Sequence, residues 1–156
     1  MRTRFPPSPT GFLHLGGLRT ALFAWLMARK TDGTFTLRIE DTDRTREVAG
    51  AAENIVRTLT WAGLIPDEGV MLDHVGKLTE RGEYGPYHQS KRLDLYKKYA
   101  DQLIESGHAY YCFCTSERLD RMRKEQEKRK QAPMYARTCL ELSKEEVRKR
   151  LAAGEK

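Results

Sequence analysis

The N-terminal stretch of residues 4–17, RFPPSPTGFLHLGG, combines one histidine with two hydroxyl groups, three prolines and three glycines. The prolines fix φ and lack an N–H donor, so this stretch cannot form a helix interior or a central strand. Gly16 and Gly17 begin the helix that the following residues predict, and a helix N-terminus favours anions such as phosphate. His14 stands just before this helix, where an imidazole N–H could reach a phosphate oxygen. A proline-rich turn with an incidental histidine is the other interpretation.

Charged and hydroxyl side chains also gather where two predicted strands end. Residues 2–6 predict a first strand, so Arg4 and Ser8 lie at or just past its end. Residues 34–40 alternate between apolar and polar side chains, which predicts a second strand that ends at Glu40. Ligands of doubly wound sheets bind beyond the carboxyl ends of the strands. We therefore expect Arg4, Ser8 and Glu40 to converge on one crevice.

Helices are expected after each of these strands. The first spans Gly16 to about Lys30 and the second Ala49 to about Ala62. The order strand, helix, strand, helix is typical of an α/β protein built on a doubly wound parallel sheet. Segment 63–85 is rich in glycine and charge and predicts a long loop, and residues 90–106 predict another helix. The expected apolar positions are Phe35, Leu37 and Ile39 in the second strand, and Leu18, Leu22, Trp25, Leu26, Met27, Ile55, Val56, Leu59, Trp61, Leu93, Tyr96, Tyr99, Leu103 and Ile104 in the helices.

The chain changes character after Gly107, and we place a second module at 108–156. Residues 109–114 predict a short strand, and a strongly charged helix is expected from Ser116 to about Lys130. Residues 133–139 predict an extended segment. Ser143 begins a last charged helix, with Glu146 three residues later in the pattern of a capping box.

Composition excludes several classes of protein. The 156 residues suffice for one ordinary domain, with 39% hydrophobic and 32% charged residues. No apolar run approaches the roughly 20 residues of a membrane span, and no signal-peptide pattern is present. Three cysteines, an odd number, argue against a disulfide framework. A cytoplasmic protein without a membrane partner is therefore expected.

The net charge of +6 is concentrated near the C-terminus, where residues 117–150 hold 12 Lys/Arg against 7 Asp/Glu. Such an excess suits a polyanionic partner such as nucleic acid. A solvated helix face is the other interpretation.

Three motifs resemble the glutamyl-tRNA synthetase family of the class I aminoacyl-tRNA synthetases. Residues 4–17 resemble its first strand and loop, RFAPSPTGxLHxGG, and residues 14–17 occupy the place of the class motif His-Ile-Gly-His. Residues 38–43, RIEDTD, match its second block, and 86–92, PYHQSKR, match its PYxQSxR element. Pro6 stands where the family usually has alanine. Because proline has no N–H, any family contact through that amide is not expected here.

The resemblance implies ATP-dependent attachment of glutamate to the 3′ end of tRNA(Glu) through a glutamyl-adenylate, with Mg²⁺ accompanying ATP. Residues 1–107 would be the amino-terminal part of the catalytic domain, containing the first half of a Rossmann-like sheet. Residues 108–156 would begin the inserted α+β domain that holds the tRNA acceptor end. The implied ATP-binding residues are Ser8, Pro9, Thr10, His14, Gly16 and Gly17, of which Thr10, His14, Gly16 and Gly17 are catalytic. The implied glutamate-binding residues are Arg4, Pro6, Ser8 and Glu40.

Other interpretations of these residues stay open. Glu40 and Asp41 could act only as helix caps. Arg92 could face the ligand or tRNA, although we expect it to be exposed to solvent. Tyr110, Tyr111 and Phe113 could stack on bases of a single-stranded tRNA end or form a small core.

The cysteines predict either a zinc site or three free, partly buried thiols. Cys112 and Cys114 lie one residue apart, and Cys139 follows 25 residues after Cys114. Some bacterial members of the family carry zinc at this spacing, with a histidine two residues after the third cysteine. Here that position is Glu141, a harder ligand, and His108 is a possible substitute.

The family's second signature, a KMSKS-like loop, is missing from these 156 residues. We therefore expect the amino-terminal portion of a longer, monomeric enzyme and do not expect this portion to charge tRNA unaided. Two alternatives remain: the related glutamyl-Q tRNA(Asp) synthetase, and a stand-alone RNA-binding module derived from a synthetase. The loop at 64–85 and the long insert favour the first interpretation.

Overall fold

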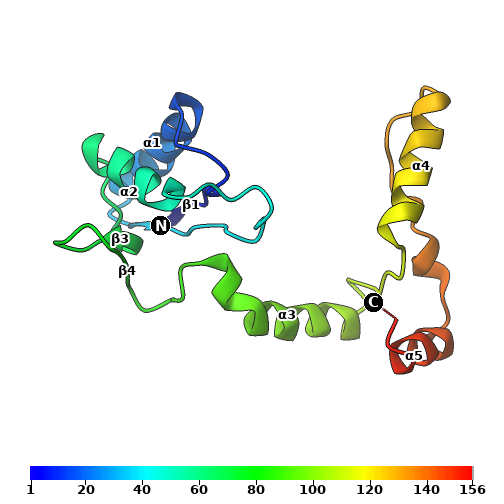
Figure 1. The fold of residues 1–156 in the computed structure, drawn as a ribbon. Coiled ribbons are helices and arrows are strands. Elements are labelled where there is room, and N and C mark those ends of the chain that lie inside the picture. The colour runs from blue at the N-terminus through cyan, green and yellow to red at the C-terminus, as the bar shows by residue number, and fades with distance from the viewer. Residues whose placement is uncertain (156) are drawn as a thin grey trace. The chain divides into compact units, whose positions relative to one another are not determined.

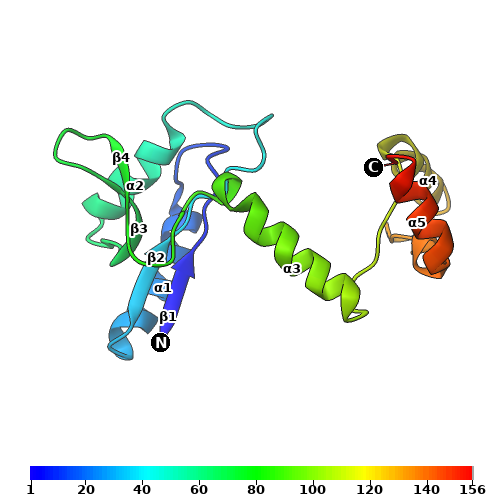
Figure 2. The same cartoon turned by 90° about the horizontal axis from the view of Figure 1, so that it is seen from below.

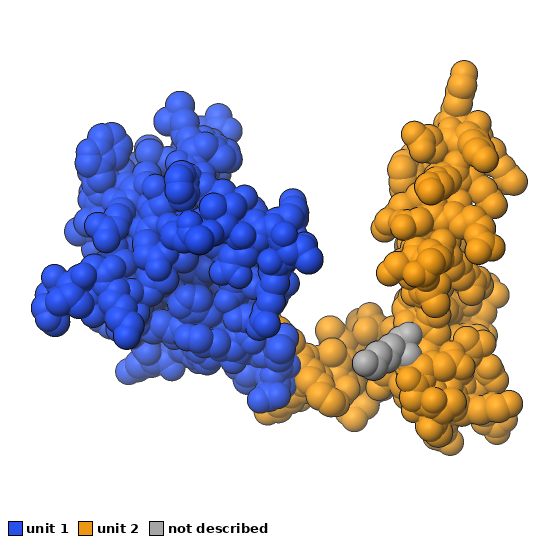
Figure 3. All heavy atoms as spheres, in the orientation of Figure 1, with its two compact units in different colours: residues 1–95 blue, residues 96–156 orange. Residues whose placement is uncertain are grey.

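The computed structural model describes residues 1–155 and divides the chain into two compact units (Figure 3). The first unit comprises residues 1–95, and the second begins at residue 96. The predicted division at 107/108 concerns functional domains and stays a prediction.

The first unit is built on a sheet of four strands in the order β1-β2-β3-β4 (Figure 1). The strand β1 (Arg2–Phe5) pairs in parallel with β2 (Thr34–Leu37), and β2 pairs in parallel with β3 (Glu68–Leu72). The last strand, β4 (Leu78–Arg81), is antiparallel to β3. The parallel order confirms the predicted α/β architecture.

Two helices connect the parallel strands, as Figure 2 shows from below: α1 (Leu15–Lys30) and α2 (Ala51–Trp61). The connections from β1 to β2 and from β2 to β3 run in the same direction across the sheet. Because such crossovers are right-handed, both helices lie on the same face of the sheet. The predicted apolar positions Phe35, Leu37 and Ile39 are fully buried on that face. The polar residues that alternate with them therefore point to the opposite face, where the candidate site lies. The strand itself ends at Leu37 rather than at the predicted Glu40, and Thr36 is buried as well, because β2 is paired on both sides.

The buried side of α1 matches the prediction only in part, since Leu18 and Trp25 pack against the core. Ala21 and Ala28 are fully buried, whereas Leu22, Leu26 and Met27 are 40%, 47% and 46% exposed. Alanine lets the helix backbone approach the sheet closely, and large apolar residues surround most of this helix, so periodicity could not identify the inner side. In α2 the predicted Ile55, Val56 and Leu59 are buried, but Trp61, at the last position, is exposed.

Segment 63–85 is not a long loop, because β3 and β4 form an antiparallel hairpin there. The carboxylate of Asp73 accepts hydrogen bonds from the Val75 and Lys77 amides and shapes the turn. Gly69 has φ +114°, and a Cβ there would lie 2.0 Å from the Leu37 carbonyl oxygen. Glycine and charged residues suggested a loop here, but Gly69 is required by the strand pairing and Asp73 by the turn.

The predicted helix over 90–106 begins as a 3₁₀ turn, η1 (Gln89–Arg92), and continues as α3 (Leu93–Glu105). Asp41 caps this turn, since its carboxylate accepts hydrogen bonds from the Ser90 amide at 2.8 Å and the Ser90 hydroxyl at 2.6 Å. Leu93, Tyr99 and Leu103, which we expected on an apolar side, are exposed.

The second unit contains α4 (Ser116–Lys128), the 3₁₀ turn η2 (Thr138–Glu141) and α5 (Lys144–Ala152). Thr115 and Ser143 cap the two α-helices, which confirms both predicted helix starts. Residues 109–114 form no strand: the Phe113 amide donates instead to the Cys139 sulfur at 3.4 Å. The predicted extended segment 133–139 ends at residue 137, because η2 begins at Thr138.

None of the helices within residues 1–155 is both long and apolar enough to cross a membrane.

Candidate active site

His14 lies immediately before α1 and caps its N-terminus. The ring Nδ1 accepts a hydrogen bond from the Gly16 amide at 3.1 Å. Nδ1 therefore acts as an acceptor, and in the neutral ring the hydrogen is carried by Nε2. An exposed N–H donor thus stands at the start of the helix, as the sequence predicts, while the Gly16 amide is engaged by the same ring.

The proline-rich loop before His14 is tied to the surrounding elements through its carbonyl groups. The Glu40 amide donates to Pro7 O and the Val48 amide to Pro9 O, both at 2.9 Å. The Leu13 amide donates to Asn54 Oδ1 of α2 at 3.0 Å. Since proline keeps its carbonyl acceptor, this loop can be fixed although it lacks three amide donors.

A cavity of about 390 Å³ opens on the sheet face opposite the helices, and a second cavity of about 350 Å³ lies between the loop and α1. Four residues of the predicted ATP group line this second cavity: Ser8, Thr10, His14 and Gly17. Pro9 is buried and Gly16 lies at the helix start, and neither lines the cavity. The structure therefore brings most of the predicted group to one place.

Arg4, near the end of β1, and Glu40, three residues past the end of β2, approach one another, as the sequence predicts. The Arg4 Nη2 atom lies 3.9 Å from Glu40 Oε1. Arg38, which sequence reasoning did not assign to the site, donates to the same oxygen from 3.2 Å. The sequence could have identified Arg38, because it alternates with the buried residues Leu37 and Ile39 and therefore lies on the same side as Glu40.

The other two predicted glutamate-binding residues lie elsewhere along the same loop. Ser8 lines the cavity beside α1, and Pro6 is half-buried. The structure therefore brings together Arg4 and Glu40 but does not bring all four residues to one point.

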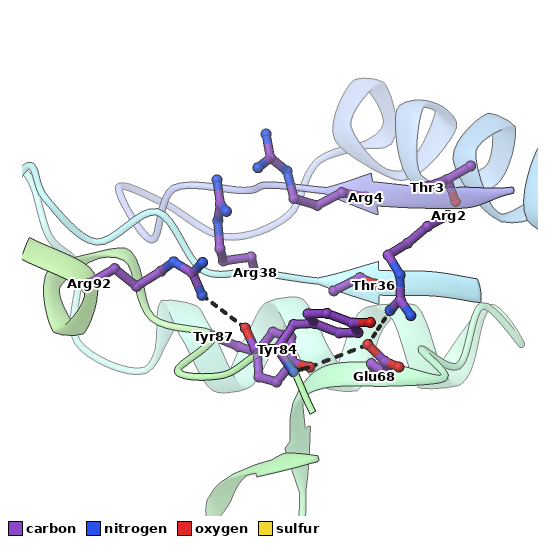
Figure 4. A pocket seen from close by; sticks show the side chains of 9 residues that line it. All are labelled: Arg2, Thr3, Arg4, Thr36, Arg38, Glu68, Tyr84, Tyr87 and Arg92. Carbon is purple, nitrogen blue, oxygen red and sulfur yellow. Dashed lines mark hydrogen bonds and ion pairs between the residues drawn. The ribbon is translucent and has the colours of Figure 1, made fainter. Parts of the chain in front are cut away.

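Four of the nine residues that line the cavity on the open sheet face are arginines (Figure 4). Arg2 forms an ion pair with Glu68 at one end. Arg92 donates to the carbonyl groups of Tyr84 at 2.9 Å and Pro86 at 2.8 Å, so it is not the solvent-exposed arginine that we expected. The lining residues are Arg2, Thr3, Arg4, Thr36, Arg38, Glu68, Tyr84, Tyr87 and Arg92.

Three polar atoms of this lining are buried without a hydrogen-bond partner: Thr36 Oγ1, Arg38 Nε and Arg92 Nε. Buried polar groups in folded proteins normally have partners. The lining holds four guanidinium groups and the Glu68 carboxylate, and Glu40 lies against two of these arginines, so positive charge remains in excess. The site therefore suits an anionic ligand that can accept hydrogen bonds.

The segment that follows the hairpin is held against the end of β2. Ile39 and His88 form a β-bridge, and the His88 ring contacts Glu80 at 2.6 Å. Burial acts to raise the pKa of the Asp41 carboxyl, but its hydrogen bonds from Ser90 outweigh this and the net shift is downward. Asp41 thus remains ionised and fixes the PYHQSKR element next to Glu40.

The three cysteines form a cluster in the second unit, with their sulfur atoms within 4.8 Å of one another. The Tyr135 hydroxyl lies 2.8 Å from Cys112 Sγ and 3.7 Å from Cys114 Sγ. Its hydrogen bond lowers the pKa of the Cys112 thiol and raises the pKa of the Tyr135 phenol. Glu141 is exposed, and among residues 1–155 neither it nor His108 belongs to the cluster. Tyr135 was missed because no spacing rule singles out a tyrosine.

The catalytic-domain model of "tRNA synthetases class I (E and Q)" matches the chain over residues 1–156. The chain belongs to this family. The class I assignment agrees with the parallel sheet and with the loop that precedes α1.

Individual class I relatives are similar over nearly the whole chain. A glutamate–tRNA ligase from Finegoldia magna is 57% identical over 157 residues, covering 99% of this chain and 32% of the relative. A glutamate–tRNA ligase from Clostridioides difficile is 53% identical, and the match covers 99% of this chain and 31% of the relative. A crystal structure of a glutamate–tRNA ligase from Elizabethkingia meningosepticum, in complex with its amino acid, superposes with a TM-score of 0.81 at 43% identity. The match covers 99% of this chain and 30% of that one. The chain thus spans about a third of the length of these relatives.

Proposed function

We propose that this chain carries the amino-terminal catalytic part of an enzyme that joins glutamate to the 3′ end of tRNA(Glu) at the expense of ATP. The observation that carries the proposal is that Arg4 of β1 lies near Glu40 and that one loop leads from β1 to His14 at the start of α1. The Glu40 amide donates to Pro7 O of the same loop. This arrangement offers a binding place for an amino acid next to one for phosphates.

The glutamate end of the site would use complementary charges. A guanidinium can bind a carboxylate through two parallel hydrogen bonds, which assigns Arg4 to a carboxylate of the substrate. Glu40 would accept the substrate's ammonium group. Ser8 and Pro6 would complete the wall of the site toward the loop.

At the ATP end the substrate carboxylate attacks the α-phosphorus, forming a mixed anhydride and releasing pyrophosphate. No side-chain nucleophile is needed, so the protein contributes alignment and stabilisation of charge. The Nε2–H of His14, the Thr10 hydroxyl and the Gly17 amide would stabilise the phosphates, with Ser8 and Pro9 shaping the wall. The Gly16 amide, which donates to His14 Nδ1, would hold the histidine ring in place. Mg²⁺ would enter with ATP, held mainly by phosphate oxygens and water.

The second unit would bind the tRNA acceptor end. Its excess of basic residues over 117–150 suits a phosphate backbone. Tyr111 and Phe113 already stack on one another, with ring centroids 6.4 Å apart, and with Tyr110 they are candidates for stacking on bases. We further propose a monomeric whole protein that acts in the cytoplasm.

The cysteine cluster fits zinc, because three thiolates and one oxygen ligand can complete a tetrahedral site. Cys112, Cys114 and Cys139 would hold the ion, and Tyr135 or the predicted Glu141 would supply the fourth ligand. A zinc ion there would tie the segment before α4 to η2 and so stabilise the second unit.

The proposal is tested by pyrophosphate exchange with the whole polypeptide that the gene encodes, in the presence of tRNA. We expect labelled pyrophosphate to enter ATP when L-glutamate is supplied, but not with L-glutamine or L-aspartate. Exchange that depends on another amino acid, or no exchange with glutamate, would overturn the proposal.

A further inference from the structure

Glu40 is approached by two guanidinium groups at one of its two carboxylate oxygens. Arg38 Nη2 lies 3.2 Å from Oε1, within hydrogen-bond distance, and Arg4 Nη2 lies 3.9 Å from the same atom, outside it. Within residues 1–155, Oε2 accepts no hydrogen bond. One oxygen of this carboxylate is therefore occupied and the other is free.

The two arginines differ in how firmly they are held. The side chain of Arg38 is 18% exposed and that of Arg4 is 46% exposed. The Arg38 backbone is fixed as well, since its amide donates to Phe5 O at 3.2 Å. Arg38 is thus a rigid partner of Glu40, whereas Arg4 keeps donors that an incoming group could use.

We propose that Arg38 is a positioning residue for the amino-acid substrate. By binding Oε1 of Glu40, it leaves Oε2 for the substrate's ammonium group and keeps Arg4 available for a substrate carboxylate. Without Arg38, the ion pair that Glu40 and Arg4 form at 3.9 Å would close to a hydrogen bond, and each residue would then occupy a group that the substrate needs. This inference rests on the proposed function.

The test measures tRNA glutamylation by the whole polypeptide and its Arg38→Gln variant. We expect the KM for glutamate to rise by about tenfold or more, the effect of losing one charge-assisted hydrogen bond. The KM for ATP should stay within about twofold, because Arg38 does not line the cavity beside α1. Arg38→Lys keeps the charge without the planar fork, so its KM for glutamate should lie between that of wild type and that of Arg38→Gln.

Arg29→Gln is the matched control. Arg29 makes the same kind of ion pair, donating to Asp67 at 2.9 and 3.0 Å, but it projects from α1 and lines neither cavity. Its loss should leave both KM values unchanged. Arg38→Gln combined with Glu40→Gln separates positioning from general damage: the double variant should be no worse than Glu40→Gln alone, because Arg38 acts through Glu40.

The outcomes distinguish this inference from the proposed function. A wild-type protein without glutamate-dependent charging overturns both. An active wild type in which Arg38→Gln and Arg38→Lys leave the KM for glutamate unchanged overturns the inference alone. A parallel rise in both KM values also overturns it, because a damaged fold would produce that result. If Arg38→Gln does not fold, the Arg38→Lys result decides.

Discussion

At the scale of single residues, His14 combines a structural and a chemical role. Its Nδ1 caps α1, and this hydrogen bond directs the Nε2–H away from the helix. Sequence reasoning identified His14 because the histidine follows a proline loop and precedes two glycines. It could not identify the capping bond, which depends on the rotamer of the ring.

Two variants of His14 should separate these roles. His14→Ala removes the cap and the donor, so we expect a loss of about 1 kcal/mol in the free energy of unfolding. In the whole polypeptide it should also slow glutamate activation about a hundredfold or more, the usual effect of losing one catalytic donor. His14→Asn restores a capping oxygen and should recover most of the stability but not the rate. Urea unfolding and pyrophosphate exchange measure the two effects, and an unchanged exchange rate in both variants would remove His14 from the mechanism.

Arg38 and Tyr135 show what residue types alone could not reveal. Arg38 matched a family motif, but only the structure shows that it shares one oxygen of Glu40 with Arg4. Tyr135 lies 23 residues from Cys112 in the sequence and meets it through the fold. Contacts of this kind depend on loop paths that no local pattern determines.

At the scale of elements, Asp67 connects α1, β2 and the start of β3. Its carboxylate accepts two hydrogen bonds from Arg29 and one from the Phe35 amide at 2.7 Å. The hydrogen bonds from Arg29 hold the pKa of this carboxyl below its ordinary value of 3.8. Because the folded-state pKa is lowered, the resulting stability is present above the unfolded pKa and is lost as the pH falls through the folded pKa.

Asp67→Asn should therefore destabilise the chain in a pH-dependent way. We expect a loss of about 1 kcal/mol near pH 7, a modest value because the Asp67 side chain is 39% exposed and solvent screens the pair. The difference from wild type should shrink as the pH falls below about 4. Urea midpoints at several pH values measure this, with Asp32→Asn, a change of an exposed carboxylate in the turn after α1, as control. A difference that is constant with pH would contradict the assigned ion pair.

The elements that were predicted correctly have strong periodicity or clear caps. Apolar and polar residue types alternate in the sequence of β2, and Thr115 and Ser143 are followed by charged helices. The β3–β4 hairpin was missed because short strands carry a weak pattern and because Gly69 fits only against the Leu37 backbone. Tertiary pairing determined those elements.

At the scale of the whole molecule, the chain holds two compact units with different expected partners. The first presents the candidate amino-acid and ATP sites, and the second presents basic helices and the cysteine cluster. The relatives are about three times longer than this chain, so the complete reaction is proposed for the whole polypeptide.

Metal content tests the organisation of the second unit. Protein purified without chelator should contain about one zinc ion per chain, and Cys139→Ser should reduce this toward zero. Tyr135→Phe and Glu141→Gln compare the two candidate fourth ligands: if Tyr135 supplies it, only Tyr135→Phe should weaken zinc retention against a competing chelator. Wild-type protein with a zinc content near zero would show that the cluster consists of free thiols.

The most direct test of the central claim is charging of unfractionated tRNA with labelled glutamate by the whole polypeptide, wild type against Arg4→Gln. The proposed function predicts that wild type forms an ester at the tRNA 3′ end, released by nuclease as glutamyl-adenosine. It also predicts that Arg4→Gln lowers kcat/KM for glutamate about a hundredfold, as expected when a charged hydrogen-bonding partner of the substrate is lost. Label that resides on an internal base, or equal charging by Arg4→Gln, would contradict the account.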